Sequence, residues 1–296
     1  MKVAFLLNPS VRRSFAAKSL PGLIQRNVSS SKELFWVDRN ISNHTEQHLE
    51  KILNGNFTHL AMASGDGTLN RVINFLARNH AMERLTCTIL PYGTCNDFAK
   101  VFGFFKKKFS NNVIAAGIKA IEQNDTRTVS VWQVNDTFFI NNAGFGRNKP
   151  NTKRRSSWQD LQSLKPVALE IQQSGKITKG NFLMMVAANA PFFSGGLHFS
   201  TDSYPGDDKL EFFFVGSAQK SRLAMRLLLG KLGFALQSKT DRSLITRIDA
   251  TELTLQSPTP ISITVDGETP PQLSNLKNAQ FKLAGHCKFT LPYAIK

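Results

Sequence analysis

The residues most able to do chemistry lie in two glycine-rich turns, and the first runs from Ser64 to Thr68 with the sequence SGDGT. An apolar run that predicts a strand precedes this turn, and residues with helical periodicity follow it. Gly65 and Gly67 let the backbone approach a ligand closely, and the amides that open a helix favour an anion such as phosphate. Asp66 could then help to hold the Mg²⁺ that accompanies a phosphate, with Thr68 as the helix N-cap. The same residues also suit an ordinary turn in which Asp66 accepts a local hydrogen bond.

The second turn, PYGTCND, occupies residues 91–97 and also follows an apolar run that predicts a strand. Because the carboxyl ends of parallel strands lie at one edge of a sheet, the two turns could converge on one ligand. Thr94 would then bond a phosphate, while Asn96 and Asp97 would either contact the ligand or cap the next helix. The chain has no Walker A loop, and neither turn is a GxGxxG loop.

The elements that must position these turns alternate between strand and helix over residues 1–125. In the clearest helix, after Thr68, four apolar residues from Leu69 to Leu76 fall on one face. Repeated strand–helix units predict a doubly wound parallel α/β sheet with ligand sites at the carboxyl ends of its strands. The predicted strands are 3–7, 34–37, 58–63 and 88–90, and the other predicted helices are 44–53 and 111–121.

The pattern changes to β structure near Thr126, so we expect a second, β-sandwich-like domain over residues 126–296. Residues 128–140 alternate in polarity around Asn135-Asp136, which predicts a hairpin. The polar, basic segment 147–180 is the least regular part of the chain, and we expect a mobile excursion there. Further strands are predicted at 181–188, 209–215, 251–256, 261–266 and 280–284, with one helix at 218–237. The last strand could return to the N-terminal domain.

The charge of the chain favours an anionic partner. The 296 residues include 37 basic and 21 acidic side chains, a formal charge of +16. Such an excess suits a phosphorylated ligand, a membrane surface or nucleic acid. The three cysteines argue against a disulfide framework and for a reducing, cytoplasmic location.

Membrane contact is expected only at the surface. No uncharged stretch approaches the roughly 20 residues that span a bilayer, and no secretory leader is predicted at the N-terminus. Residues 101–109 interleave phenylalanine with lysine, and residues 147–158 are rich in basic side chains. Both clusters could lie at an anionic lipid headgroup layer, or they could be solvated basic loops.

Together, SGDGTLNRVIN and PYGTCNDFAK resemble the diacylglycerol kinase catalytic domain, in particular that of the bacterial soluble lipid kinases. That family usually has GGDGTLNEV followed by P-x-G-T-x-N-D-F-A at a similar separation. Other pieces of the chain agree with the resemblance: LLNPS at 6–10, NNAGFG at 141–146, NAPFFSGGLHFS at 189–200 and VDGE at 265–268. The resemblance therefore covers nearly the whole chain, with Ser64 in place of the first glycine and Arg71 in place of the usual glutamate.

The resemblance implies an ATP- and Mg²⁺-dependent kinase of a diacylglycerol-like lipid, with its active site in the cleft between two domains. Glu268 would be the general base and Asp66 would position Mg-ATP. A lone VDGE would otherwise be interpreted as a β-turn. The residues that would contact ATP by match to the motifs are Asn8, Ser64, Gly65, Asp66, Gly67, Thr68, Asn70 and Thr94.

The family also has a structural Mg²⁺ site in a D-G-x-L loop, which matches DDKL at 207–210. Asp207 would supply a side chain, and Tyr204 and Lys209 would supply carbonyl oxygens. Asp208 stands where the family has glycine. Aspartate tolerates positive φ less well than glycine does. Its carboxylate, however, could favour a cation.

Other functions remain open from sequence alone. NAD kinase shares a GGDGT loop, although the GTCNDFA segment argues against it. A basic lipid- or nucleic-acid-binding protein without catalysis is a second alternative, although no nucleic-acid-binding module is recognisable. The acceptor could be diacylglycerol, monoacylglycerol, phosphatidylglycerol or a sphingoid base. The protein could also form a homodimer.

Overall fold

The computed structural model describes residues 1–8, 13–38, 40–41, 43–93, 96–102, 111–146, 164–193, 197–198, 203–217 and 245–290. The chain divides into two compact units. Unit 1 comprises Met1–Val131 with Gly285–Lys296, and unit 2 comprises Trp132–Ala284. Strands β5 (Thr126–Val134) and β16 (Leu276–Thr290) each contribute residues to both units.

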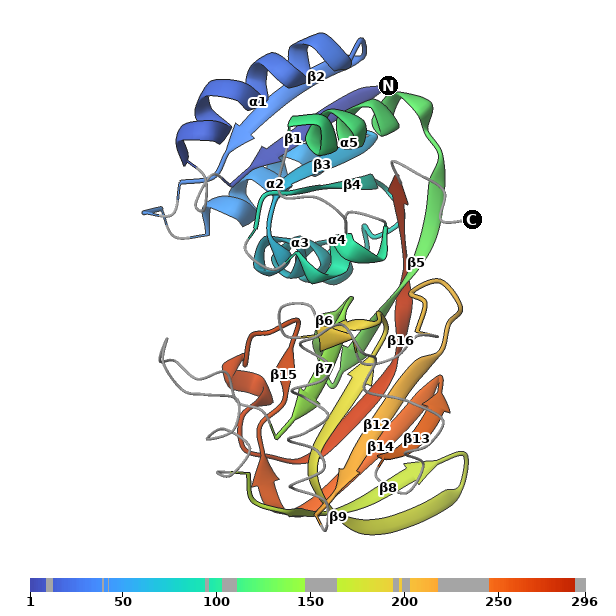
Figure 1. Cartoon of the computed structure of the whole chain (residues 1–296). Helices are drawn as coiled ribbons and strands as arrows, with labels where there is room; N and C mark the ends of the chain where they lie inside the picture. The colour runs from blue at the N-terminus through green and yellow to red at the C-terminus, as the bar shows by residue number, and fades with distance from the viewer. Residues whose placement is uncertain are drawn as a thin grey trace. The chain divides into compact units, whose positions relative to one another are not determined.

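Unit 1 contains a parallel sheet with the strand order β16-β4-β3-β1-β2 (Figure 1). Phe5 in β1 pairs with Leu34 in β2 and Ala61 in β3, and Phe289 at the end of β16 pairs with Cys87 in β4. The other elements of unit 1 are β1 (Lys2–Leu7), α1 (Arg13–Asn27), β2 (Ser31–Trp36), α2 (His44–Asn54), β3 (His59–Ser64), α3 (Asp66–Arg78), β4 (Thr86–Pro91), α4 (Asp97–Val101) and α5 (Asn111–Gln123).

Helices cover both faces of this sheet, as the doubly wound prediction requires. Helices α1 and α5 bury residues such as Ile24 and Ile118 against Phe5 and Leu90 of the sheet. Helix α3 packs against β3, and α2 packs beside α3. Figure 1 shows α3 and α4 on the face of the sheet opposite α1 and α5. The predicted apolar face of α3 is confirmed, because the residues from Leu69 to Leu76 on that face are buried.

Unit 2 is rich in antiparallel β structure. Strand β9 pairs with β12 along one edge and with β8 and β7 along the other. The predicted hairpin at Asn135-Asp136 is confirmed as β5 and β6. The strands of unit 2, besides β5 and β16, are β6 (Thr137–Phe139), β7 (Asn142–Phe145), β8 (Val167–Gln173), β9 (Lys176–Ala188), β10 (Phe192–Phe193), β11 (Leu197–His198), β12 (Leu210–Gly216), β13 (Ile245–Ala250), β14 (Glu252–Ile261) and β15 (Thr264–Val265), with a short 3-10 helix, η3 (Pro271–Leu273).

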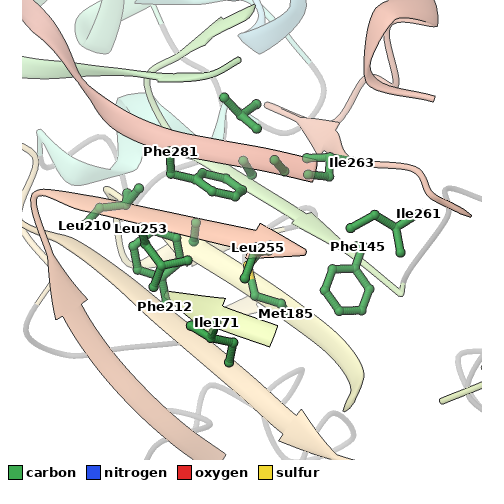
Figure 2. Close-up of a cluster of buried hydrophobic side chains, with 14 of the residues drawn as sticks. Phe145, Ile171, Met185, Leu210, Phe212, Leu253, Leu255, Ile261, Ile263 and Phe281 are labelled. Carbon is green, nitrogen blue, oxygen red and sulfur yellow. The ribbon is translucent and has the colours of Figure 1, made fainter. Parts of the chain in front are cut away.

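The strands of unit 2 enclose one apolar core (Figure 2). Phe281 of β16 meets Phe212 of β12 edge to face, with ring centroids 5.3 Å apart. Met185, Leu253 and Leu255 are fully buried in the same cluster. Alternate residues of β8 and β12, such as Leu169 with Ile171 and Phe212 with Phe214, enter this core, as expected for strands with one face inward.

Several predicted elements were wrong. The segment 147–180 was expected to be a mobile excursion, yet residues 167–173 form β8 and β9 begins at Lys176. In β8, Leu169 and Ile171 are buried while their neighbours are partly exposed, so the strand carries only two core residues among polar ones. The predicted strand 261–266 is reduced to Thr264–Val265, because β14 extends to Ile261.

The elements that were not predicted include helix α1 and the strands β7 and β13. Helix α1 contains Pro21, which disfavours an isolated helix, and its burial against α5 stabilises it instead. The predicted helix 218–237 and residues 147–163 lie outside the described residues. Within the described part of the chain, no helix has the length and apolar character needed to cross a bilayer.

Burial lowers the pKa of His59, and we expect this to make the fold sensitive to mild acid. His59 is 7% exposed at the start of β3, and its Nε2 lies 3.2 Å from Asn124 Oδ1. Desolvation is the largest cause of the lowered pKa, and the Asn124 hydrogen bond opposes it. The unfolded chain therefore binds a proton more readily than the folded one. The free energy of unfolding should hold above the ordinary value of 6.5 and fall as pH drops below it.

Urea unfolding at about pH 7.5 and about pH 5.5 measures this loss. His59→Gln should reduce the difference in unfolding free energy between the two pH values. It should not abolish the difference, because burial also lowers the pKa of His48. His80→Asn is the control, since His80 is exposed and asparagine accepts its positive φ of 51°. An unchanged pH difference in His59→Gln would show that His59 does not carry the effect.

Candidate active site

The first glycine turn lies where the strand order of the unit 1 sheet reverses, between β1 and β3. In doubly wound sheets, ligands bind at the carboxyl ends of the strands at this position. Asn8 follows β1, and its backbone N–H donates to Ala63 O at 3.0 Å. Its side-chain Nδ2 donates to Thr68 Oγ1 at 2.9 Å, which ties the end of β1 to α3. Asn8 Oδ1 is buried and has no hydrogen-bond partner among the described residues, so it can accept a hydrogen bond from a ligand or coordinate a cation.

Helix α3 begins at Asp66, so the prediction that Thr68 is its N-cap was wrong. Gly65 is the N-cap, with extended backbone, and no side chain caps this end of the helix among the described residues. Thr68 instead lies in the first turn, where its N–H bonds to Gly65 O at 3.1 Å. The site therefore has a helix N-terminus without a side-chain cap, which suits an anion.

The two glycine turns are in direct backbone contact. A Cβ atom added to Gly93 would lie 2.4 Å from Gly65 Cα and 2.6 Å from Asn96 Oδ1. Asn96 holds the second turn closed, because its Oδ1 accepts from Gly93 N and its Nδ2 donates to Gly93 O, each at 2.8 Å. The backbone of Asn96 has a positive φ of 50°, which asparagine tolerates better than most residues. Thr94, the predicted phosphate contact in this turn, lies outside the described residues.

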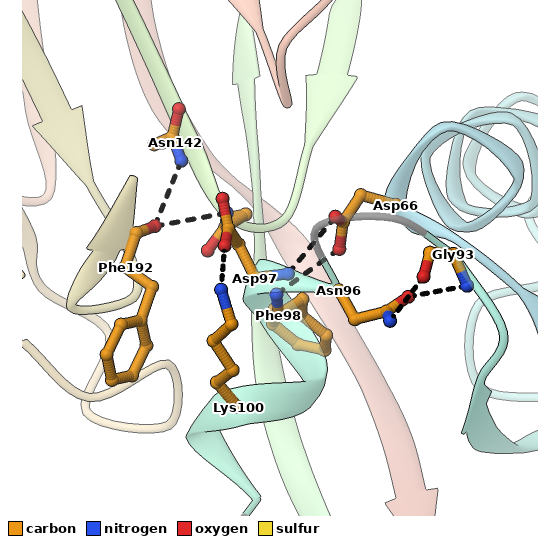
Figure 3. A network of polar contacts seen from close by, with 9 residues as sticks. Asp66, Gly93, Asn96, Asp97, Phe98, Lys100, Asn142 and Phe192 are labelled. Carbon is orange, nitrogen blue, oxygen red and sulfur yellow. Dashed lines mark hydrogen bonds and ion pairs between the residues drawn. The ribbon is translucent and has the colours of Figure 1, made fainter. Parts of the chain in front are cut away.

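Asp66 also joins the two turns. Its Oδ2 accepts from Asp97 N at 3.1 Å and its Oδ1 from Phe98 N at 3.3 Å (Figure 3). The carboxylate therefore caps α4 across the sheet edge, through residues more than 30 positions further along the chain. Asp97 is 5% exposed, and its Oδ1 lies 2.5 Å from Lys100 Nζ.

The remaining predicted ATP contacts lie in and beside this turn. Ser64 is the last residue of β3, and Gly67 is the second residue of α3. Asn70 is nearly buried in α3, where its Oδ1 accepts from Asn74 Nδ2 at 3.3 Å. The structure thus brings the residues from Ser64 to Asn70 together with Asn8 at one edge of the sheet.

In unit 2, VDGE forms a tight turn. Val265 N donates to Glu268 O at 2.7 Å, and Glu268 N donates to Val265 O at 2.8 Å. Asp266 and Gly267 have φ values of 45° and 87°, as in the two-residue hairpin turns that prefer Asp-Gly. The Glu268 side chain is exposed at the end of this turn.

Sequence reasoning missed the role of Asp266 inside this motif. Its Oδ1 accepts from the backbone N–H groups of Asn141 and Asn142 at 2.9 and 3.0 Å, and its Oδ2 accepts from Ile140 N at 3.0 Å. The carboxylate thereby joins the VDGE turn to the NNAGFG segment, two motifs far apart in the chain. The motifs themselves were recognised, but their contact depends on the fold.

The predicted structural Mg²⁺ loop is a turn in which Lys209 N donates to Asp207 Oδ1 at 3.0 Å and Gly206 N donates to Tyr204 O at 2.8 Å. Asp208, which stands in place of the family's glycine, adopts a positive φ of 56°. The substitution therefore preserves the left-handed backbone that a glycine would favour. In the described part of the chain, no group of three or more His, Cys, Asp or Glu side chains is placed to hold a metal.

The parallel sheet and its glycine turns define unit 1 as a doubly wound α/β domain, the class that binds nucleotides where the strand order reverses. Residues 2–134 match the family model of the diacylglycerol kinase catalytic domain. This part of the chain is therefore similar to a lipid kinase catalytic domain, which supports a lipid kinase.

Relatives and solved structures agree with this assignment. The chain is 24% identical to a diacylglycerol kinase of Bacillus subtilis (strain 168) over 248 residues, which are 78% of this chain and 80% of the relative. It is 23% identical to a diacylglycerol kinase of Staphylococcus aureus (strain JH9) over 283 residues, which are 90% and 86% of the two chains. A crystal structure of a diacylglycerol kinase from Bacillus anthracis str. Sterne has the same fold, with a TM-score of 0.74 and 20% identity over 98% of this chain and 96% of the other.

Proposed function

We propose that this protein transfers the γ-phosphate of ATP, in the presence of Mg²⁺, to a hydroxyl group of a diacylglycerol-like lipid. The observation that carries the proposal is the N-terminus of α3, which has no side-chain cap among the described residues. It lies in the first of the two glycine turns, which contact each other. Backbone amides in such a place bind phosphate without a bulky side chain in the way. The names of the curated relatives support the choice of acceptor.

In this proposal, unit 1 binds the nucleotide. The amides of the Gly65-Asp66-Gly67 turn bind the phosphates, and Asn8 uses its buried Oδ1 to orient the nucleotide or its cation. Ser64, Thr68, Asn70 and Thr94 complete the predicted contacts. Asp66 holds the second turn against the first by capping α4, so the two turns keep one arrangement when phosphate binds.

The residues also fit a Mg²⁺ ion beside the phosphates. A carboxylate offers about four acceptor positions, so Asp66 can contribute to metal binding as well as cap α4. Mg²⁺ would supply neutralisation of the charge on the transferring phosphoryl group. For the structural site, the positive φ of Asp208 keeps the turn in which Asp207 and the carbonyls of Tyr204 and Lys209 would hold a second ion.

The proposed general base is Glu268 in unit 2. Glu268 takes the proton of the lipid hydroxyl as that oxygen forms its bond to the γ-phosphorus, and ADP leaves with the bridging oxygen. The exposed side chain of Glu268 has no hydrogen bond among the described residues, which leaves its oxygens available to a substrate. Asp266, the other carboxylate of VDGE, is engaged by three backbone amides and is less suited to accept a proton.

We further propose that the protein works in the cytoplasm at an anionic membrane surface, where a peripheral enzyme reaches its lipid. The formal charge of +16 supports attraction to such a surface. The two basic clusters from which the membrane contact was predicted lie largely outside the described residues.

A panel of acceptors in mixed micelles tests the function. The protein is incubated with Mg²⁺ and ATP labelled in the γ-phosphate, together with diacylglycerol, monoacylglycerol, phosphatidylglycerol, sphingosine or, in a separate reaction, NAD⁺. We expect labelled phosphate in the lipid extract, with diacylglycerol as the preferred acceptor. Label in NADP⁺ instead would favour an NAD kinase, and no transfer to any acceptor would favour a binding protein without catalysis.

A further inference from the structure

The carboxylate of Asp266 lies at the centre of a polar network within unit 2. It accepts three backbone amides, from Ile140, Asn141 and Asn142, at 2.9 to 3.0 Å. The contact is reciprocal, because Asp266 N donates to Asn142 O at 2.8 Å. Hydrogen bonds to a charged acceptor are stronger than neutral ones, so this group fixes the VDGE turn to the segment that precedes β7.

The segment that Asp266 contacts is itself held in place. Asn189 Nδ2 donates to Ile140 O at 2.6 Å, and Asn189 Oδ1 accepts from Trp132 Nε1 at 2.9 Å. Asn189 is 1% exposed and Trp132 is fully buried. The Asp266 carboxylate therefore binds to a rigid part of the core rather than to a free loop.

A second contact holds the same segment on its other side. Asn142 Nδ2 donates to Phe192 O at 3.4 Å (Figure 3). Asn141 Nδ2 donates to the same oxygen at 3.3 Å. Phe192 belongs to the NAPFFSGG motif. Three of the motifs that carry the family resemblance thus meet in one partly buried network around Asp266.

We propose that Asp266 is a positioning residue for Glu268, an inference that rests on the proposed role of Glu268 as the general base. The backbone of Glu268 is bonded only to Val265 across the turn among the described residues, at 2.7 and 2.8 Å. Strand β15 reaches β7 through two paired residues, Thr264 with Gly144 and Val265 with Ala143. This short ladder orients the strand, and Asp266 fixes the tip of the turn that presents Glu268.

The substitution Asp266→Asn tests the contact with little change in size. An amide has one carbonyl oxygen, so its NH₂ group must face at least one of the three backbone N–H donors. The turn should then shift by a fraction of an ångström, while the β15–β7 ladder and the apolar core remain. A misplacement of about 1 Å in a reacting group can cost about 100-fold in rate, which sets an upper bound for this smaller shift.

The experiment is a double-mutant cycle with Asp266→Asn and Glu268→Gln, measured as kcat and as KM for ATP. We expect Asp266→Asn to lower kcat by about 10- to 100-fold and to change KM for ATP by less than about twofold. In the Glu268→Gln background, Asp266→Asn should have no further effect, because a residue that acts only through Glu268 has nothing left to position. Asp136→Asn is the matched control, since Asp136 is an exposed aspartate in the β5–β6 hairpin turn of the same unit.

The outcomes separate the positioning role from the proposed function. Losses that multiply in the double variant, or an unchanged kcat in Asp266→Asn, would overturn the positioning role alone. A Glu268→Gln enzyme with full activity would overturn the assignment of the base and the positioning role together. If Asp266→Asn does not fold, Asp266→Glu keeps the charge-assisted bonds but lengthens the side chain, and the same absence of a further effect in the Glu268→Gln background is expected.

Discussion

Glu268→Gln is expected to lower kcat by about 10²- to 10⁴-fold, the usual contribution of a general base. Glutamine keeps the shape of the side chain but cannot take the proton of the lipid hydroxyl. The free energy of unfolding should not change, because the Glu268 side chain is exposed and makes no hydrogen bond among the described residues. Steady-state kinetics with saturating lipid, together with urea unfolding, measure both expectations.

The affinity for ATP gives a further check on this variant. Glu268 lies in unit 2, whereas the proposed phosphate contacts lie in unit 1, so the dissociation constant for ATP should be unaltered. Glu252→Gln is a matched control, because it removes the charge of another exposed glutamate in unit 2. If Glu268→Gln retained more than about a tenth of the kcat, Glu268 would not be the general base.

Gly93→Ala is expected to weaken ATP binding by about 100-fold or more, by analogy with the cost of displacing a binding group. The new methyl group would lie 2.4 Å from Gly65 Cα and 2.6 Å from Asn96 Oδ1. Neither neighbour is the end of a flexible side chain, since one is backbone and the other is held by two hydrogen bonds to Gly93. The two turns must therefore separate, which moves the amides proposed to bind phosphate.

Titration calorimetry with ATP, supported by thermal unfolding, measures this effect. Gly216→Ala is the control, because a Cβ at Gly216 meets no atom within 4 Å. It should bind ATP like the original protein. Wild-type affinity in a folded Gly93→Ala protein would mean that the contact between the two turns does not shape the nucleotide site.

The sequence predicted an element correctly where its local residue pattern is compatible with a single type of secondary structure. The apolar periodicity of α3 and the Asn135-Asp136 hairpin were predicted correctly because local spacing and turn chemistry are sufficient for both. Helix α1 was missed because its stability comes from packing against α5, which local sequence does not encode. Strand β8 was missed because Leu169 and Ile171 are its only fully buried residues.

In the candidate site, too, features set by local sequence were predicted, and features set by contacts between distant segments were not. The glycine turns were recognised from their residues, but the helix start was placed too late in the chain. Asn8 bonds Thr68 Oγ1, and Gly65 rather than Thr68 is the N-cap. The capping of α4 by Asp66 joins residues more than 30 positions apart, so no local pattern predicts it. The network around Asp266 likewise depends on contacts between distant segments.

The most direct test of the central claim follows the phosphoryl group itself. The protein is incubated with Mg²⁺, diacylglycerol in mixed micelles, and ATP carrying ¹⁸O in its γ-phosphate, and the extracted lipid is analysed by mass spectrometry. The account predicts a lipid phosphomonoester that carries the labelled phosphoryl oxygens, formed by the original protein and not by Glu268→Gln. Label found only in inorganic phosphate, with the lipid unchanged, would contradict it.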